Sequence, residues 1–266
     1  DQDGYDPISF AFIDKTDEVY SNDSVGVAAN LEMNSGSVVR SLNLNFFNID
    51  RFYTGPYNYE GTNVEFSWQE KRTLGEGSLL YGIIADNERT LIEDVSKDIN
   101  KSHIFSEYIF SDEEKFNFTL SGRVSGHSQF GRSSTARVNA SYKLDGGVIL
   151  RSSLGSGYRA PSLYELFAPF YGNSNLQPET SVAVDFGVEL PLVSDQAVMS
   201  ATVFETTISD RIVYDNDTFA YGQTSEVEKR AGFEIGLDYK LSTRSKVNIS
   251  YTYTDDGKGN RVQKVP

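Results

Sequence analysis

Side chains capable of acid–base or metal chemistry are few in this sequence of 266 residues. It contains no cysteine, which excludes disulfides and thiolate metal sites, and its two histidines are His103 and His127. A hydrolase needs a nucleophile paired with a base, and His127 and Ser128 are adjacent. Neighbours in a strand point to opposite faces, so this pair predicts no catalytic dyad. We therefore expect no enzymatic activity.

Carboxylates are the other group that could do chemistry, as ligands of a hard cation. They gather in three loop-like stretches, which are Asp14 to Asp23, Asp86 to Asp98 and Asp215 to Asp217. Such runs ordinarily mark solvated loops. Calcium is the alternative, with Asp215 and Asp217 as candidate ligands. A second set, Asp1, Asp3 and Asp6, lacks the rest of an EF-hand loop. We expect no cofactor, apart from calcium in these loops.

Composition narrows the class of protein and its partners. The net charge of −14 disfavours nucleic acid, which is bound by Lys and Arg that neutralise phosphates. The 22 Gly, 16 Tyr and 17 Phe favour strands and turns. No run of about 20 apolar residues predicts a transmembrane helix, and the first residues do not resemble a signal peptide. A mean hydropathy of −0.41 would suggest a soluble protein, but only alternate residues of a membrane barrel face lipid.

Period-2 alternation is the dominant pattern, and it recurs about a dozen times. In one of the clearest strands, Val184 and Phe186 share a face while Asp185 occupies the other. A later strand places Ile235 and Leu237 opposite charged residues in the same way. The charged face would meet solvent in a sandwich and a wet lumen in a barrel. Alternation alone leaves both architectures open.

Connection lengths favour the barrel. Short turns such as Asp145-Gly146-Gly147 alternate with longer acidic or aromatic segments. The long segments are Arg51 to Tyr59, Arg89 to Asn100, Arg159 to Pro178 and Asp215 to Gln223. Short turns at one end and long loops at the other are the layout of outer-membrane barrels. The sequence predicts an all-β, antiparallel transmembrane β-barrel segment of about twelve strands in one domain, residues 1–266.

Several segments are more specific than this pattern. They are Gln129-Phe130-Gly131-Arg132, GSGYRAPSLYELF from Gly155 to Phe167, FYGNSNLQPETS from Phe170 to Ser181, and Ser209 to Asp215. Together they resemble TonB-dependent receptors, best the cobalamin (vitamin B12) receptor branch. The return strand from Glu228 to Leu241 is also similar, although Phe233 stands where that motif usually has Val. The resemblance covers residues 100 to 266 well and residues 1 to 100 only by pattern.

The resemblance implies an uptake receptor in the outer membrane of a Gram-negative bacterium. Its expected partners are TonB, contacted through an N-terminal plug segment, a small ligand such as cobalamin, and outer-membrane lipid. A complete receptor of this family has a plug domain and a 22-stranded barrel. This sequence shows no plug-like stretch and ends at Pro266. We therefore expect an incomplete barrel, an internal fragment with two unpaired edges.

Solute capture is expected in the extracellular loops. The residues we expect to contact the solute are Tyr158, Arg159, Tyr164, Phe167, Phe170, Tyr171, Asn173 and Tyr214. Aromatic rings supply contact area at low entropy cost, and polar groups orient the ligand. Packing within a folded rim explains the same residues equally well. Pro161 is expected to end ladder pairing, and Glu179 to accept hydrogen bonds at the loop base.

Other functions remain open on the sequence. A siderophore or haem receptor would use the same scaffold with different loops. A passive porin shares the alternation but is not expected to carry Arg159-Ala160-Pro161 or Asn175-Leu176-Gln177-Pro178-Glu179. An adhesin-like β domain would bind sugars or proteins through its aromatic loops and would stay in solution without detergent.

Overall fold

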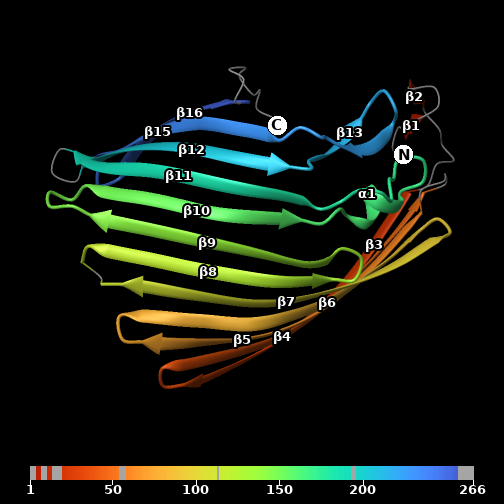
Figure 1. Ribbon diagram of the computed structural model, residues 1–266, viewed down its shortest axis with the longest axis horizontal. Coiled ribbons are helices and arrows are strands. Elements are labelled where there is room, and N and C mark those ends of the chain that lie inside the picture. Colours follow the sequence, from red (N-terminus) through yellow and green to blue (C-terminus); the bar gives the residue numbers. More distant parts are fainter. Residues whose placement is uncertain are drawn as a thin grey trace.

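The computed structural model describes residues 4–6, 11–13, 20–53, 58–112, 114–192 and 196–256. Twelve strands form one sheet in which every neighbouring pair is antiparallel. They are β3 (Tyr20–Ser35), β4 (Val38–Tyr53), β5 (Tyr59–Leu74), β6 (Gly77–Ile92), β7 (Val95–Ser111), β8 (Phe116–His127), β9 (Gly131–Lys143), β10 (Ile149–Arg159), β11 (Glu179–Leu192), β12 (Ala197–Ser209), β15 (Glu228–Ser242) and β16 (Ser245–Asp255). Each pairs with its neighbour in this order, so the sheet is a meander of hairpins (Figure 1).

Two small two-stranded sheets and one helix complete the described structure. β1 (Gly4–Asp6) pairs with β2 (Ala11–Ile13), and β13 (Ile212–Asp215) pairs with β14 (Ala220–Gln223). Helix α1 (Leu163–Phe167) lies between β10 and β11. No helix of the described residues is long and apolar enough to cross a bilayer.

One face of the large sheet is apolar and uncovered. Val184, Phe186, Ile235 and Leu237 keep between 36% and 51% of their surface exposed. They would be sealed between two layers in a sandwich, so their exposure rules out that architecture. Residues directly opposed across strands lie on the same face, and Val184 opposes Leu154 in this way. The predicted apolar face is confirmed, and no second sheet among the described residues covers it.

The other face carries polar and charged side chains that bond from strand to strand. Asn43 Nδ2 donates to Ser67 Oγ at 3.0 Å, and Asn45 Nδ2 donates to Glu65 Oε1 at 3.2 Å. Lys101 Nζ contacts Glu88 Oε2 at 2.8 Å. These cross-strand pairs lie on the polar face that the alternation predicts, which is the face that lines the lumen in an outer-membrane barrel.

The two ends of the sheet differ. One end holds tight connections, such as the turn at Gly36 and Ser37 and the turn at Gly75 and Glu76. The opposite end holds α1 and the β13–β14 hairpin (Figure 1). This asymmetry is that of outer-membrane barrels, in which short turns are periplasmic and long loops extracellular.

The prediction of a long loop from Arg89 to Asn100 is wrong. β6 and β7 continue through it and are joined by a two-residue turn, in which Glu93 has a φ of 51°. The charged residues that suggest a loop are instead cross-strand partners, for example Arg89 and Asp98 at 3.5 Å. Strands that extend beyond the bilayer are polar on both faces, so they lose the alternation that identifies a strand.

Candidate functional site

The connection between β10 and β11 is a folded element rather than an open loop. Pro161 lacks a backbone donor, and ladder pairing of β10 with β11 ends two residues before it. Ser162 then caps α1: its Oγ accepts from Glu165 N at 3.2 Å, and Glu165 Oε2 accepts from Ser162 N at 2.7 Å. This reciprocal capping box starts a helix of five residues.

Arg159 ties this helix to the sheet. Its Nη1 donates to Glu165 Oε2 at 3.0 Å, and its Nε donates to Glu179 Oε2 at 2.6 Å. Burial by itself would raise the pKa of Glu165, but the hydrogen bonds from Arg159 and Ser162 outweigh it and lower that pKa. The carboxylate of Glu165 is therefore charged at neutral pH and holds both partners.

Glu179 connects the β10–β11 segment to the β12–β15 segment. Its Oε1 accepts from Ile212 N, the first residue of β13, at 2.5 Å. The expected role of Glu179 as an acceptor at the loop base is confirmed, and its partners are Arg159 and Ile212.

The β13–β14 hairpin packs against the segment that follows α1. Tyr221 N donates to Tyr171 O at 2.8 Å, and Asn173 Nδ2 donates to Tyr221 O at 3.0 Å. Gln223 Nε2 donates to Gln177 O at 2.6 Å. Two segments whose contacting residues are 46 to 50 positions apart in the chain therefore form one body, which we call the rim. It comprises residues 160–178 and 210–227.

A small hydrophobic core stabilises the rim. Leu166 and Leu176 from residues 160–178 are buried together with Ile212 from residues 210–227. Phe130, Phe167 and Tyr221 pack around them. Lys97 Nζ lies 4.5 Å from the centre of the Phe167 ring, a cation–π contact that links the rim to β7.

Gly172 is required by close backbone approach. A Cβ at this position would lie 2.6 Å from Ala168 N and 2.7 Å from Ala168 O. Gly172 N also donates to Ala168 O at 2.8 Å. A side chain would push the chain away from α1 and break this turn.

Four tyrosines from both segments form a cluster on the rim. The ring centres of Tyr171 and Tyr214 are 6.1 Å apart, those of Tyr214 and Tyr221 5.3 Å, and those of Tyr164 and Tyr221 6.2 Å. These distances are typical of edge-to-face aromatic pairs. Tyr164 and Tyr214 are exposed. The cluster is an aromatic platform with hydroxyl groups, suited to an amphipathic ligand.

The expected solute-contact residues divide into exposed and structural groups. Tyr164, Tyr171 and Tyr214 come together in the tyrosine cluster, and sequence analysis missed Tyr221 beside them. Phe170 is 84% exposed and has a φ of 68°. The structural group is Tyr158, Arg159, Phe167 and Asn173, whose side chains are engaged within the protein or half-buried. Exposed Phe219, with a φ of 54°, is a second missed aromatic residue.

A cavity of about 810 Å³ lies below the rim, against the polar face of β5 to β10. Leu163 lines it from the rim, Tyr158 and Arg159 line it from the end of β10, and Glu88 and Lys101 line it from β6 and β7. Its volume is within the range of small-molecule sites.

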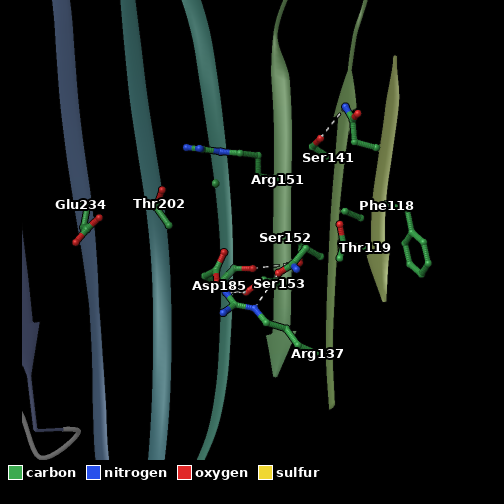
Figure 2. A pocket seen from close by; sticks show the side chains of 14 residues that line it. Phe118, Thr119, Arg137, Ser141, Arg151, Ser152, Ser153, Asp185, Thr202 and Glu234 are labelled. Carbon is green, nitrogen blue, oxygen red and sulfur yellow. Dashed lines mark hydrogen bonds between the residues drawn. The ribbon is translucent and has the colours of Figure 1, made fainter. Parts of the chain in front are cut away.

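A second hollow, of about 470 Å³, lies on the same polar face nearer the short turns. Figure 2 shows its charged residues, which are Arg137 of β9, Arg151 of β10, Asp185 of β11 and Glu234 of β15. Arg137 Nη2 donates to Ser153 Oγ at 3.3 Å, and Ser153 Oγ donates to the carboxylate of Asp185. Arg151 Nη1 contacts Glu189 Oε1 at 2.9 Å. Both signs of charge line this part of the lumen.

The side chains of His127 and Ser128 accept hydrogen bonds from different backbone groups. His127 Nδ1 accepts from Gln129 N at 3.2 Å, and Ser128 Oγ accepts from Asn100 N at 3.1 Å. The other histidine, His103, forms a hydrogen bond between its Nδ1 and Ser125 Oγ at 2.9 Å. These two residues oppose each other across β7 and β8 on the polar face. Asp86 Oδ2 is 3.6 Å from His103 Nε2, longer than a hydrogen bond.

Asp215 stabilises a turn in the β13–β14 connection. Its Oδ1 accepts from Asp217 N at 2.8 Å and its Oδ2 from Thr218 Oγ1 at 2.9 Å, which lowers its pKa. Across the described ranges, no group of three or more His, Cys, Asp or Glu is arranged to hold a metal ion. Calcium binding at Asp215 and Asp217 stays a prediction, and Asp1 and Asp3 lie outside the described residues.

Comparison with known proteins identifies the architecture. A family model described as "TonB dependent receptor-like, beta-barrel" matches residues 3–266. The siderophore receptor PirA from Pseudomonas aeruginosa has a TM-score of 0.79 at 17% identity, over 89% of this chain and 50% of that one. The copper transporter OprC has a TM-score of 0.72 at 15% identity, over 89% and 48%. The ferric enterobactin receptor PfeA from Pseudomonas aeruginosa has a TM-score of 0.71 at 18% identity, over 89% of this chain and 43% of that one.

At these identities the structural similarity shows a shared fold. The chain spans about half the length of the solved structures that it matches.

Proposed function

Because this chain belongs to the TonB-dependent receptor-like β-barrel family, we propose that the protein carrying it imports a scarce, bulky solute by TonB-coupled active transport. The family lies in the outer membrane of Gram-negative bacteria and consists of transporters and receptors. The observation that carries the proposal is the rim, where tyrosines from two extracellular segments meet above a polar lumen wall. The energy partner is TonB, contacted through the plug segment that the family places before its barrel.

The exposed aromatic residues of the rim are the proposed contacts with the solute. Tyr164, Phe170 and Tyr214 come from the sequence prediction, and Phe219 joins them from the structure. Tyr171 supports Tyr214 from the side. Arg159, Phe167 and Asn173 position this surface through their contacts inside the rim. Tyr158 acts in the cavity below, which accepts the solute after it leaves the platform.

Cobalamin or a related corrinoid is the first candidate solute. Support comes from the segments Gly155 to Phe167 and Phe170 to Ser181, which resemble the cobalamin receptor branch. A ferric siderophore is the second, since PirA and PfeA are named siderophore and enterobactin receptors. Both are large, partly apolar metal complexes that an aromatic platform suits.

That residues 1–266 are one incomplete barrel domain stays a prediction.

Uptake by cells with and without TonB tests the proposal. The intact protein is expressed, and accumulation of labelled cyanocobalamin, ferric enterobactin and haemin is measured. We expect one of these solutes to accumulate only when TonB is present. Accumulation that survives deletion of TonB would indicate a passive porin, and recovery of the protein in the soluble fraction would indicate an adhesin-like domain.

A further inference from the structure

A charged cluster interrupts the apolar, lipid-facing side of the sheet. Arg40 of β4 lies directly opposite Glu70 of β5, and Glu70 lies opposite Tyr81 of β6. Arg72 is on the same face, two residues beyond Glu70 along β5. The face assignment follows from the same register, because Leu42 and Trp68 form the next pair along β4 and β5.

Glu70 is at the centre of this cluster. Its side chain is 4% exposed, and three donors reach it. Arg40 Nε lies 2.6 Å from Oε2, Arg72 Nε contacts Oε1, and Tyr81 Oη donates to Oε1 at 2.6 Å. Both contacts to the arginines are made at Nε, and both guanidinium groups remain partly exposed. The carboxylate thus orients two arginines on the membrane side of the sheet.

The cluster has one positive charge more than it has negative. It contains two guanidinium groups and a single carboxylate. The residues opposite the arginines on this face are apolar, namely Met33 across from Arg40 and Val38 and Leu79 across from Arg72. An excess charge beside apolar groups is poorly screened, so an anion in contact with it is strongly favoured.

The depth of the cluster matches that of lipid headgroups. Arg40, Glu70, Arg72 and Tyr81 lie two to four residues from the strand ends at the short turns. At a rise of about 3.3 Å per residue and a tilt near 45°, this is roughly 5–10 Å from the end of the sheet that holds the short turns. The rings of Trp68 and Tyr81, with centres 5.9 Å apart, lie beside the arginines. Such rings mark the boundary between hydrocarbon and headgroups.

We propose that Arg40 and Arg72 form a binding site for the phosphodiester of a phospholipid headgroup in the periplasmic leaflet. Guanidinium groups bind phosphate oxygens in a bidentate arrangement, and Glu70 fixes the orientation of two guanidinium groups before the phosphate binds. Leu42 and Trp68, on the hydrocarbon side of the arginines, would contact the acyl chains. A free phosphate ion would lack this second contact, so the site selects an anchored lipid.

Native mass spectrometry of the intact protein in detergent tests the site. Short-chain phosphatidylglycerol is titrated against the wild type and against the double variant Arg40→Gln/Arg72→Gln. We expect at least tenfold weaker binding in the double variant. The matched control is Arg89→Gln, an arginine on the same face near the opposite strand end, which should bind as the wild type does. Equal binding by the double variant and the wild type would overturn the proposal.

A second measurement uses the unmodified protein, in case the double variant does not fold. Dicaproyl glycerol, which has acyl chains but no phosphate, should bind at least tenfold more weakly than phosphatidylglycerol of the same chain length. Inorganic phosphate at millimolar concentration should not displace phosphatidylglycerol. Equal binding of the two lipids would show that the chains alone are recognised, and displacement by inorganic phosphate would show a general anion site. Either result would refute a phospholipid site.

Discussion

Arg159 and Glu179 face each other across β10 and β11, joined by two parallel hydrogen bonds. Arg159 Nε reaches Oε2 at 2.6 Å and Nη2 reaches Oε1 at 3.0 Å. This geometry requires the planar fork of arginine. Since Glu179 also accepts from Ile212 N, one ion pair anchors both extracellular segments of the rim to the barrel wall.

Replacing Arg159 by Lys should loosen the rim without unfolding the barrel. Lysine keeps the charge but cannot form the two parallel hydrogen bonds. For a half-exposed ion pair, we expect this to lower the free energy that holds the rim folded by about 1 kcal/mol. Amide exchange in residues 163–172 should then be roughly fivefold faster, since each 1.4 kcal/mol is tenfold. The control is Arg151→Lys, which alters another arginine–glutamate pair on β10, far from the rim. Equal exchange in wild type and Arg159→Lys would contradict this role.

The rim should also loosen in acid, through Glu165. Its pKa is lowered in the folded protein, so its stabilising effect is complete above the unfolded value, about 4.3. The effect is lost as the pH falls below that value and through the folded pKa. Amide exchange of Glu165 and Leu166, corrected for the intrinsic rate, should be constant from pH 7 to about pH 5 and accelerate below it. Glu165→Gln should remove this dependence, and an unchanged profile in that variant would assign it to another group.

Gly172→Ala should disrupt the turn after α1. The added Cβ would collide with backbone atoms of Ala168, at 2.6 and 2.7 Å. We expect proteases to cleave between residues 168 and 178 in this variant and not in the wild type. Gly222→Ala, in the same rim, is the matched control, because its Cβ meets nothing within 4 Å. Resistance of Gly172→Ala to cleavage would show that the turn tolerates a side chain.

Removal of a ring from the tyrosine cluster should weaken solute binding. Tyr164→Ala and Tyr214→Ala each delete an exposed ring, which at a binding hot spot costs more than about 1 kcal/mol. Binding to the intact protein of the solute found by uptake should therefore be about tenfold weaker in each variant. Tyr251→Ala removes a tyrosine on the lipid face of β16 and should leave binding unchanged. Full affinity in both rim variants would exclude the platform as the binding surface.

The two faces of β11 should respond differently to the same charge. Val184→Arg places a guanidinium in hydrocarbon and should destabilise the barrel by about 2–4 kcal/mol. Ala183→Arg points to the lumen, opposite Gly155 and Thr206, and should cost less than about 1 kcal/mol. Urea unfolding of the intact protein from lipid vesicles measures both. Similar losses in the two variants would mean that the assigned faces are not lipid and water.

The alternation of Val184, Asp185 and Phe186 determined the strand and its apolar and polar faces from the sequence, while the connection lengths favoured the barrel. Period 2 is a local property of the backbone, so adjacent residues suffice to read it. The same reasoning failed from Arg89 to Asn100, where β6 and β7 leave the bilayer and both faces are polar. There, pairing between β6 and β7, for example of Arg89 with Asp98, keeps both segments extended. The sequence of one strand alone does not indicate which residues it pairs with.

The chemistry of the rim depended on tertiary structure. The sequence by itself determined a barrel segment of this family and the aromatic character of its loops. It did not determine that Tyr221 joins Tyr164, that Glu179 holds Ile212, or that Glu70 gathers two arginines on the lipid side. Those contacts join residues on different strands or loops, and they exist only once strand register and stagger have been set by the whole sheet. Side-chain type is a property of the sequence, whereas which side chains meet across strands is a property of the assembled sheet.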